Sequence, residues 1–159
     1  MNYTEIAKQV IEKVKYIAVA TCNKEGQPWN TPVYAAYDEN YNFYWTSYKG
    51  NQHSINIRDN SKIFIVIYDS TGGIGNKTGV YIQAEAYELS ELEDIRTARS
   101  YTQGRKGKEV DDPRKFVGDQ PRRVYIAKPQ KVWVNDATIT ESKLEEAEFI
   151  RDYRIEIKL

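Results

Sequence analysis

The chain has 159 residues, a length typical of one domain, and its 23 basic residues balance 23 acidic residues. This balance disfavours nucleic acid and anionic membranes as partners, because both attract an excess of basic residues. One cysteine, Cys22, excludes an internal disulfide, and one histidine, His53, excludes a histidine-rich metal site. We therefore expect a single domain over residues 1–159 in the cytoplasm, with no metal, no targeting segment and no membrane span.

The first part of the chain alternates short strands with tight turns after one helix. An apolar stripe predicts a helix over residues 3–14, within an N-terminal segment 1–15. Further along, the pattern predicts strands at 16–22, 28–37, 43–47, 63–68 and 80–88 and a short helix at 55–59. Such a series is typical of an antiparallel meander or barrel, with its core over residues 16–89.

Two of these strands have a predicted place in the sheet. Residues 28–37 contain two prolines, which cannot donate to a strand ladder, so this strand is expected at an edge or on a ligand-lined face. Residues 63–68 are apolar on both faces, which indicates a central strand.

The second part of the chain is predicted to hold a helix, a charged connection and three strands. Residues 90–123 contain a helix at 91–103 and then a connection with seven basic and four acidic residues. In the segment 124–159, strands are predicted at 124–128, 131–135 and 153–159. The fold class is therefore mainly β (α+β), with a barrel-like sheet and two or three helices packed outside it.

Several familiar site patterns fail on detail. The glycine-rich residues 72–79 have Asn76 where a phosphate-binding loop needs glycine, and a strand pattern follows where a dinucleotide site needs a helix. We interpret them as a hairpin loop. His53 and Ser54 are adjacent in sequence, and adjacent residues rarely align a general base with its nucleophile. Cys22 is expected to be a buried structural thiol.

The most informative stretch is residues 28–60, where an aromatic strand, a polar loop and a short helix follow one another. The loop carries hydroxyl, ammonium, amide and imidazole groups, on Ser47, Lys49, Gln52, His53 and Ser54. Such groups beside a helix N-terminus suit a phosphate. An alternative is that Asn51 or Ser54 caps the helix while Lys49 is solvated, and the residues alone leave both interpretations open.

A family resemblance favours the phosphate interpretation. The run GQPWNTPVYAAYDENYNFYWTSYKGNQHSINIRDNSKIFIVIYDS, followed by GVYIQAEAYEL, resembles the FMN-binding split barrel of pyridoxamine 5'-phosphate oxidase-like proteins over residues 16–89. The resemblance implies an antiparallel split β-barrel with peripheral helices, FMN as cofactor, and a homodimer with the flavin at its interface.

The resemblance also implies a set of cofactor-binding residues. The flavin-facing strand falls on residues 30–35, the aromatic-threonine pair beside the ribityl-phosphate on Trp45-Thr46, and the basic phosphate pair on Gln52-His53. A tryptophan after KPQK, in the C-terminal strands, fits the family more loosely. The predicted cofactor-binding residues are Asn30, Thr31, Pro32, Val33, Trp45, Thr46, Ser47, Lys49, Gln52, His53, Ser54 and Trp133.

This chain departs from the family pattern at the cations. Family members usually carry Arg in place of Asn30, Lys in place of Ala35, and Arg-Lys in place of Gln52-His53. We expect Lys49 and a protonated His53 to hold the phosphate instead.

The resulting functional prediction is a small FMN-dependent oxidoreductase that acts on a small molecule. No catalytic residue is assigned, because the flavin itself carries the hydride or electron chemistry. The alternatives are a haem-binding split barrel with His53 as axial ligand, a non-catalytic flavin carrier, and a nucleic-acid-binding barrel with tyrosine stacking platforms. The neutral net charge weighs against the last of these.

Overall fold

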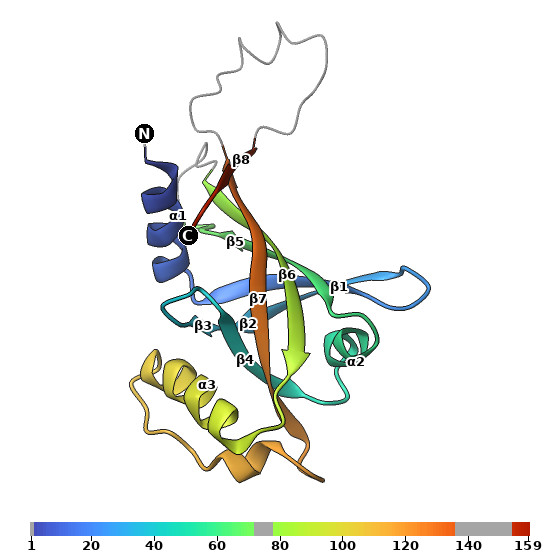
Figure 1. Cartoon of the computed structure of the whole chain (residues 1–159). Helices are drawn as coiled ribbons and strands as arrows, with labels where there is room; N and C mark the ends of the chain where they lie inside the picture. Colours follow the sequence, from blue (N-terminus) through green and yellow to red (C-terminus); the bar gives the residue numbers. More distant parts are fainter. Residues whose placement is uncertain (1, 72–77, 136–153) are drawn as a thin grey trace, which may run out of the picture.

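The computed structural model describes residues 2–71, 78–135 and 154–159 (Figure 1). Its helices are α1 (Tyr3–Lys13), α2 (Gln52–Asp59), α3 (Leu92–Gly104) and the 3-10 helix η1 (Pro113–Phe116). Its strands are β1 (Tyr16–Cys22), β2 (Pro28–Tyr34), β3 (Ala36–Tyr37), β4 (Phe43–Tyr48), β5 (Lys62–Tyr68), β6 (Gly79–Glu88), β7 (Arg122–Asn135) and β8 (Arg154–Ile157). Most of the predicted glycine-rich loop and the first residue of the predicted last strand lie outside the described residues.

The strands form one curled antiparallel sheet in the order β2-β1-β5-β6-β7-β4-β3, with β8 paired to β7. This arrangement confirms the split-barrel prediction, and the three α-helices pack around the sheet (Figure 1). The apolar strand β5 lies between β1 and β6, as its composition predicted. Among the described strands, β2 pairs with β1 alone, so the proline-containing strand lies at a sheet edge.

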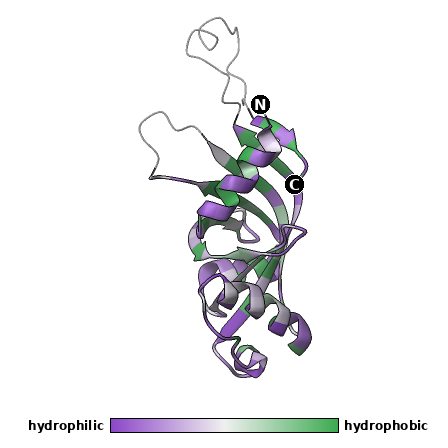
Figure 2. Ribbon diagram, turned by 90° about the vertical axis from the view of Figure 1, so that its left-hand side faces the viewer, coloured by the Kyte–Doolittle hydropathy of each residue, from purple (hydrophilic) through white to green (hydrophobic). Residues whose placement is uncertain are grey.

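Alternation of apolar and polar residues determines which face of each strand is buried. In β5 the isoleucines at 63, 65 and 67 are buried, and in β6 Val80, Ile82, Ala84 and Ala86 are buried. Helix α1 covers this apolar face with Ala7 and Ile11, and Figure 2 shows the hydrophobic strand residues beneath it. The period-2 pattern therefore fixes the core by burying one face of each strand.

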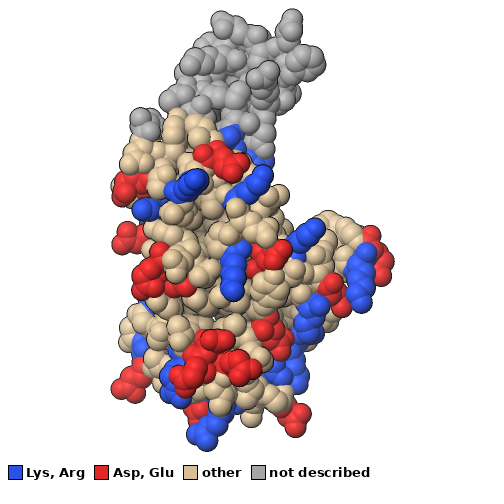
Figure 3. All heavy atoms as spheres, viewed as in Figure 1, with Lys and Arg blue, Asp and Glu red and all other residues tan. Residues whose placement is uncertain are grey.

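Basic and acidic side chains are interspersed over the face of the molecule shown in Figure 3. This mixture matches the formal net charge of zero. Within the described residues, no helix is both long enough and apolar enough to cross a membrane.

Four local predictions were wrong in detail. Helix α2 begins at Gln52, not at residue 55. The predicted strand 28–37 is divided between β2 and β3, and the predicted strands 124–128 and 131–135 are one strand, β7. Cys22 is half-buried rather than buried, and its Sγ accepts a hydrogen bond of 3.1 Å from Asn60.

Strand β7 continues through Pro129 because this proline lies where β7 pairs with β6 but with neither β4 nor β8. The register with β6 shifts between Gln83 and Ala84, opposite Lys131 and Pro129. Residues 122–127 of β7 pair with β4 and residues 132–135 pair with β8, so Pro129 lies between these two ladders. A proline lacks an N–H donor and is tolerated at such a bulge.

Arg105, directly after α3, ties this helix to the start of the chain. Its guanidinium donates hydrogen bonds to the carbonyl oxygens of Ile11, Glu12 and Val14 at 2.6–3.1 Å. It also donates to the carbonyl oxygen of Ala35 at 2.9 Å. One side chain therefore fixes α3 against the end of α1 and the corner between β2 and β3.

We expect Arg105→Ala to lower the free energy of unfolding by about 2–3 kcal/mol, because charge-assisted hydrogen bonds to several carbonyls are lost together. Urea unfolding monitored by tryptophan fluorescence measures this loss. Lys108→Ala is the matched control: its side chain is exposed, so a change within about 0.5 kcal/mol is expected. Equal losses of unfolding free energy in the two variants would show that the hydrogen bonds of Arg105 do not stabilise the fold.

Candidate functional site

A cavity of about 200 Å³ opens where β2, β4, α2 and α3 come together. Four consecutive β2 residues, two β4 residues, the start of α2, and α3 with the turn after it contribute its lining. The lining residues are Thr31, Pro32, Val33, Tyr34, Thr46, Ser47, Asn51, His53, Arg99, Thr102 and Lys106. Most of these side chains are polar, and two are basic, so the cavity is suited to an anionic group.

His53 and Ser47 form the wall of the cavity next to α2. The imidazole is 2 % exposed, and its Nε2 lies 2.8 Å from the hydroxyl oxygen of Ser47. Burial lowers the pKa of His53 below its usual value near 6.5. Burial therefore favours the neutral imidazole, whereas the prediction for the phosphate site requires its protonated form.

The first turn of α2 borders the same wall. Asn51 is the N-cap residue, and its carbonyl oxygen accepts the hydrogen bond from the Ile55 N–H at 3.0 Å. The Asn51 side chain makes no capping hydrogen bond and lines the cavity instead. The first N–H groups of a helix have no partner within it, so this uncapped end suits an anion. The capping interpretation therefore gains no support from the side-chain geometry.

Arg99 enters the cavity from α3 and is 6 % exposed. Its Nε and Nη2 donate to the two carboxylate oxygens of Asp111, both at 2.7 Å. Its Nη1 donates to the hydroxyl oxygens of Thr46, at 2.9 Å, and Thr102, at 3.2 Å. Arg99 thus connects α3 to β4 while the carboxylate of Asp111 neutralises its charge.

Lys106 provides the second basic group, from the turn after α3. Its Nζ lies 4.5 Å from the centroid of the Tyr34 ring on β2, a cation–π distance. Burial lowers the pKa of Lys106, and the neighbouring charges of Arg99 and Lys108 lower it further. Because Arg99 is paired with Asp111, Lys106 contributes most of the net positive charge at the cavity.

The structure brings together half of the residues predicted to bind a cofactor. The six that line the cavity are Thr31, Pro32, Val33, Thr46, Ser47 and His53. The other six, which lie elsewhere, are Asn30, Trp45, Lys49, Gln52, Ser54 and Trp133.

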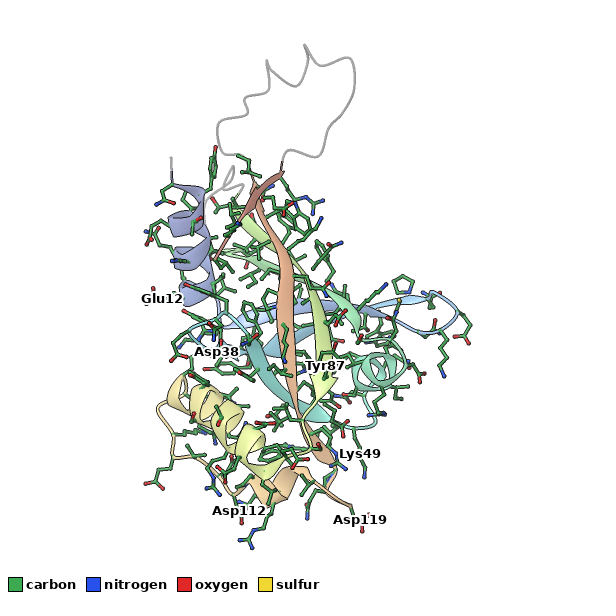
Figure 4. All side chains as sticks on the ribbon, viewed as in Figure 1. Glu12, Asp38, Lys49, Tyr87, Asp112 and Asp119 are labelled. Atoms are coloured by element: carbon green, nitrogen blue, oxygen red, sulfur yellow. The ribbon has the colours of Figure 1, made fainter. Side chains whose placement is uncertain are left out.

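Three of the six residues outside the cavity lie on the surface. Asn30 is exposed on β2, one residue before the cavity lining begins. Lys49 is exposed beyond the end of β4 (Figure 4). Gln52 is exposed in the first turn of α2, and its amide donates to Asn56 Oδ1 at 2.8 Å. Lys49 therefore does not line this cavity, whereas a different lysine, Lys106, does.

The other three residues pack against neighbouring side chains. The indole of Trp45 is fully buried and stacks on Tyr125, with ring centroids 5.6 Å apart. Ser54 is also fully buried, beside the hydroxyl of Tyr125. Trp133, in β7, stacks against Phe64 with centroids 6.4 Å apart.

Sequence reasoning missed three cavity residues, Arg99, Thr102 and Lys106. They come from α3 and the charged connection, which contains acidic as well as basic residues. Arg99 and Thr102, three residues apart, lie on one side of α3, and this spacing was available in the sequence, whereas Lys106 lies in the turn after the helix. Tyr34 and Asn51 lie within stretches that the sequence had marked, although neither was named as a binding residue.

Comparison with known proteins identifies a family and a shared fold. A family model described as pyridoxamine 5'-phosphate oxidase matches residues 3–136. No curated protein matches the sequence.

Solved structures with the same fold have diverse descriptions. The heme storage protein HutZ from Vibrio cholerae is 18% identical, with a TM-score of 0.69 over 82% of this chain and 92% of that one. A protein assigned to 5-nitroimidazole antibiotic resistance from Bacteroides thetaiotaomicron is 12% identical, with a TM-score of 0.68 over 83% and 82% of the two chains. An F420 reductase is 15% identical, with a TM-score of 0.59 over 79% and 94%. At these identities the likeness shows the fold alone.

The buried imidazole predicts a pH dependence of stability. The pKa of His53 is lower in the folded chain than in the unfolded chain, where it is near 6.5, so the unfolded chain binds the proton more readily. As the pH decreases from 6.5, the free energy of unfolding therefore decreases, by at most about 1.4 kcal/mol per pH unit. His53→Gln should show a shallower decline. Urea unfolding between about pH 7.5 and pH 5 measures both slopes. Identical slopes would mean that folded and unfolded His53 bind protons equally well.

Proposed function

We propose that this chain, which belongs to the pyridoxamine 5'-phosphate oxidase family, is a small FMN-dependent oxidoreductase. The observation that carries this proposal is the composition of the cavity. A neutral imidazole, four aliphatic hydroxyls, an uncapped helix start, an arginine and a lysine line one space of about 200 Å³. These donors match the oxygen atoms of a phosphate.

The residues present fit the phosphate-bearing end of FMN. Ser47 and the first turn of α2 would donate to the phosphate oxygens, and Lys106, which lines the same cavity, would supply a positive charge. Thr46 is held in place by its hydrogen bond from Arg99. The side chain of His53 would orient the hydroxyl of Ser47 through their contact of 2.8 Å. This chain would thus hold the phosphate without the family's usual basic pair at residues 52–53.

The size of the cavity supports a homodimer with the flavin at its interface. Ligand sites usually measure about 300–1,000 Å³, more than this cavity provides. The remainder of the flavin would lie along β2, whose outer edge is unpaired among the described strands. Exposed aromatic rings flank this edge, with Tyr16 65% and Trp29 49% exposed. A second copy placed there would complete the site by two-fold symmetry.

Bound FMN would supply the hydride or electron transfer chemistry. The residues of this chain would bind and orient the flavin and exclude water from its phosphate end. No residue is assigned as catalytic, and the small-molecule substrate stays unassigned.

Haem binding is a second candidate because of His53. A neutral imidazole is the form that binds iron, and this imidazole lines the cavity. Its Nε2 is engaged by Ser47, however, and would have to leave that hydroxyl. The visible spectrum of the purified protein separates the candidates: flavin bands support the proposal, whereas a Soret band supports haem.

Lys106→Ala is expected to weaken FMN binding by about tenfold or more, because one charge-assisted contact to the phosphate is lost. Riboflavin, which lacks the phosphate, should bind nearly as before. Fluorescence titration of both ligands measures the difference.

The matched control for this titration is Lys49→Ala. This lysine was the sequence-based candidate, but its exposed side chain does not line the cavity. FMN affinity should be unchanged in this variant. Equal weakening of FMN and riboflavin in Lys106→Ala, or an effect confined to Lys49→Ala, would contradict the proposed phosphate site.

Light scattering of the flavin-loaded protein at micromolar concentration should give the mass of two chains. Tyr16→Glu should shift this equilibrium towards one chain and release flavin, since it places a charge beside the edge strand. Leu92→Glu, at an exposed position that starts α3, is the control and should leave both properties unchanged. A monomer that retains its flavin would rule out a shared site.

A further inference from the structure

We propose that Lys106 is a reactive amine that forms an imine with small carbonyl compounds carrying an anionic group. This goes beyond flavin binding, and it concerns the cavity when FMN does not occupy it. The imine requires only an accessible primary amine, a cavity that admits the carbonyl carbon, and donors that bind the anionic group. The structure places the amine and these donors in the lining of one cavity.

The amine is both accessible and held in position. Lys106 follows α3, and its backbone N–H donates to the carbonyl oxygen of Gln103 at 2.9 Å. The residue is exposed, so reagents can reach it. Its Nζ nevertheless lies against the face of Tyr34, 4.5 Å from the ring centroid, rather than extending into solvent. An amine held at a cavity wall loses less freedom on reaction than a lysine on an open surface.

The charges around Lys106 favour the neutral, nucleophilic form overall. Partial burial, Arg99 on α3, Lys108 in the same turn and Arg122 on β7 all lower its pKa. Asp111 opposes this effect, and the ring face of Tyr34 also attracts the ammonium form. The net direction is downward, which raises the fraction of neutral amine relative to an isolated lysine.

Hydrogen-bond donors elsewhere in the cavity lining favour a carbonyl compound that carries an anionic group. Ser47, Asn51 and the first turn of α2 face the same cavity as Lys106. A carboxylate bound by these donors would hold its carbonyl carbon near the amine. A cavity of about 200 Å³ accommodates a reagent of a few heavy atoms. Small 2-oxo acids and aldehyde acids are therefore the chemical class that this arrangement selects.

The reaction balances without an oxidant or reductant. The lone pair of neutral Lys106 Nζ attacks the carbonyl carbon, and a C–N bond forms as the carbonyl oxygen takes a proton. The carbinolamine then loses its hydroxyl group with a proton from nitrogen, as water, and a C=N bond remains. Hydrolysis reverses the sequence, so the imine is a reversible adduct.

The experiment treats the purified full-length protein, after any bound flavin has been removed, with glyoxylate and sodium cyanoborohydride, which reduces the imine to a stable secondary amine. Mass spectrometry of the intact protein and of its peptides gives the extent and position of modification. Acetaldehyde, which lacks the carboxylate, is the comparison reagent. Inorganic phosphate is the competitor for the anion-binding wall. Lys106→Arg removes the amine, and Lys108→Arg is the matched control two residues away.

We expect glyoxylate to modify Lys106 several times faster than the exposed Lys49 and Lys108. Lys106→Arg should abolish the fast phase, Lys108→Arg should retain it, and phosphate should slow it. Modification spread evenly over exposed lysines would overturn the proposal. Equal rates with acetaldehyde, or no effect of phosphate, would overturn the anion preference. These outcomes are read on the amine alone, so they are distinguishable from failure of FMN to bind.

Discussion

The buried contact between Arg99 and Asp111 determines the shape of the candidate site. Arg99 is almost fully buried in α3, and both oxygens of Asp111 accept its hydrogen bonds from the connection that follows the helix. The face of the guanidinium lies 4.8 Å from the ring centroid of Phe116 in η1, and its remaining nitrogen reaches Thr46 on β4. One side chain therefore joins a helix, a loop and the sheet. Burial alone would raise the pKa of Asp111, but the hydrogen bonds and charge of Arg99 lower it, so the pair stays ionised at neutral pH. Breaking such a buried pair from one side typically costs about 3–5 kcal/mol.

Because Asp111 neutralises Arg99, the two basic residues at the cavity, Arg99 and Lys106, differ in what they contribute. Arg99 uses its donors on protein acceptors and shapes the wall, whereas none of the salt bridges between described residues involves Lys106. The positive charge that is not paired in a salt bridge at this cavity is therefore that of Lys106. The proposed phosphate binding and the proposed carbonyl chemistry therefore depend on the same side chain.

Local patterns predicted the sheet well because each strand buries one face. The alternation of Val80, Ile82, Ala84 and Ala86 identified β6, and the isoleucine-rich run identified β5 as an interior strand. Boundaries that depend on tertiary contacts were harder to predict. The start of α2 at Gln52 has no apolar stripe, because its buried first-turn residues, His53 and Ser54, are polar. The continuity of β7 through Pro129 depends on a bulge between two partner strands, which is a property of the sheet and not of the segment.

The candidate site was predicted only where its residues are close in sequence. Residues 31–33, 46–47 and 53 come from one stretch, and the resemblance to known flavin proteins pointed to it. Arg99 meets Thr46 across 53 positions of sequence, a contact that no local pattern encodes. The family's usual cations at residues 52–53 are absent here, and the fold supplies two others from α3 and its following turn. Positive charge at this cavity can therefore be provided by either element, because α2 and α3 border the same cavity from different sides. In this chain a lysine and an uncapped helix start line the same cavity, although the family's usual basic pair is absent from the sequence.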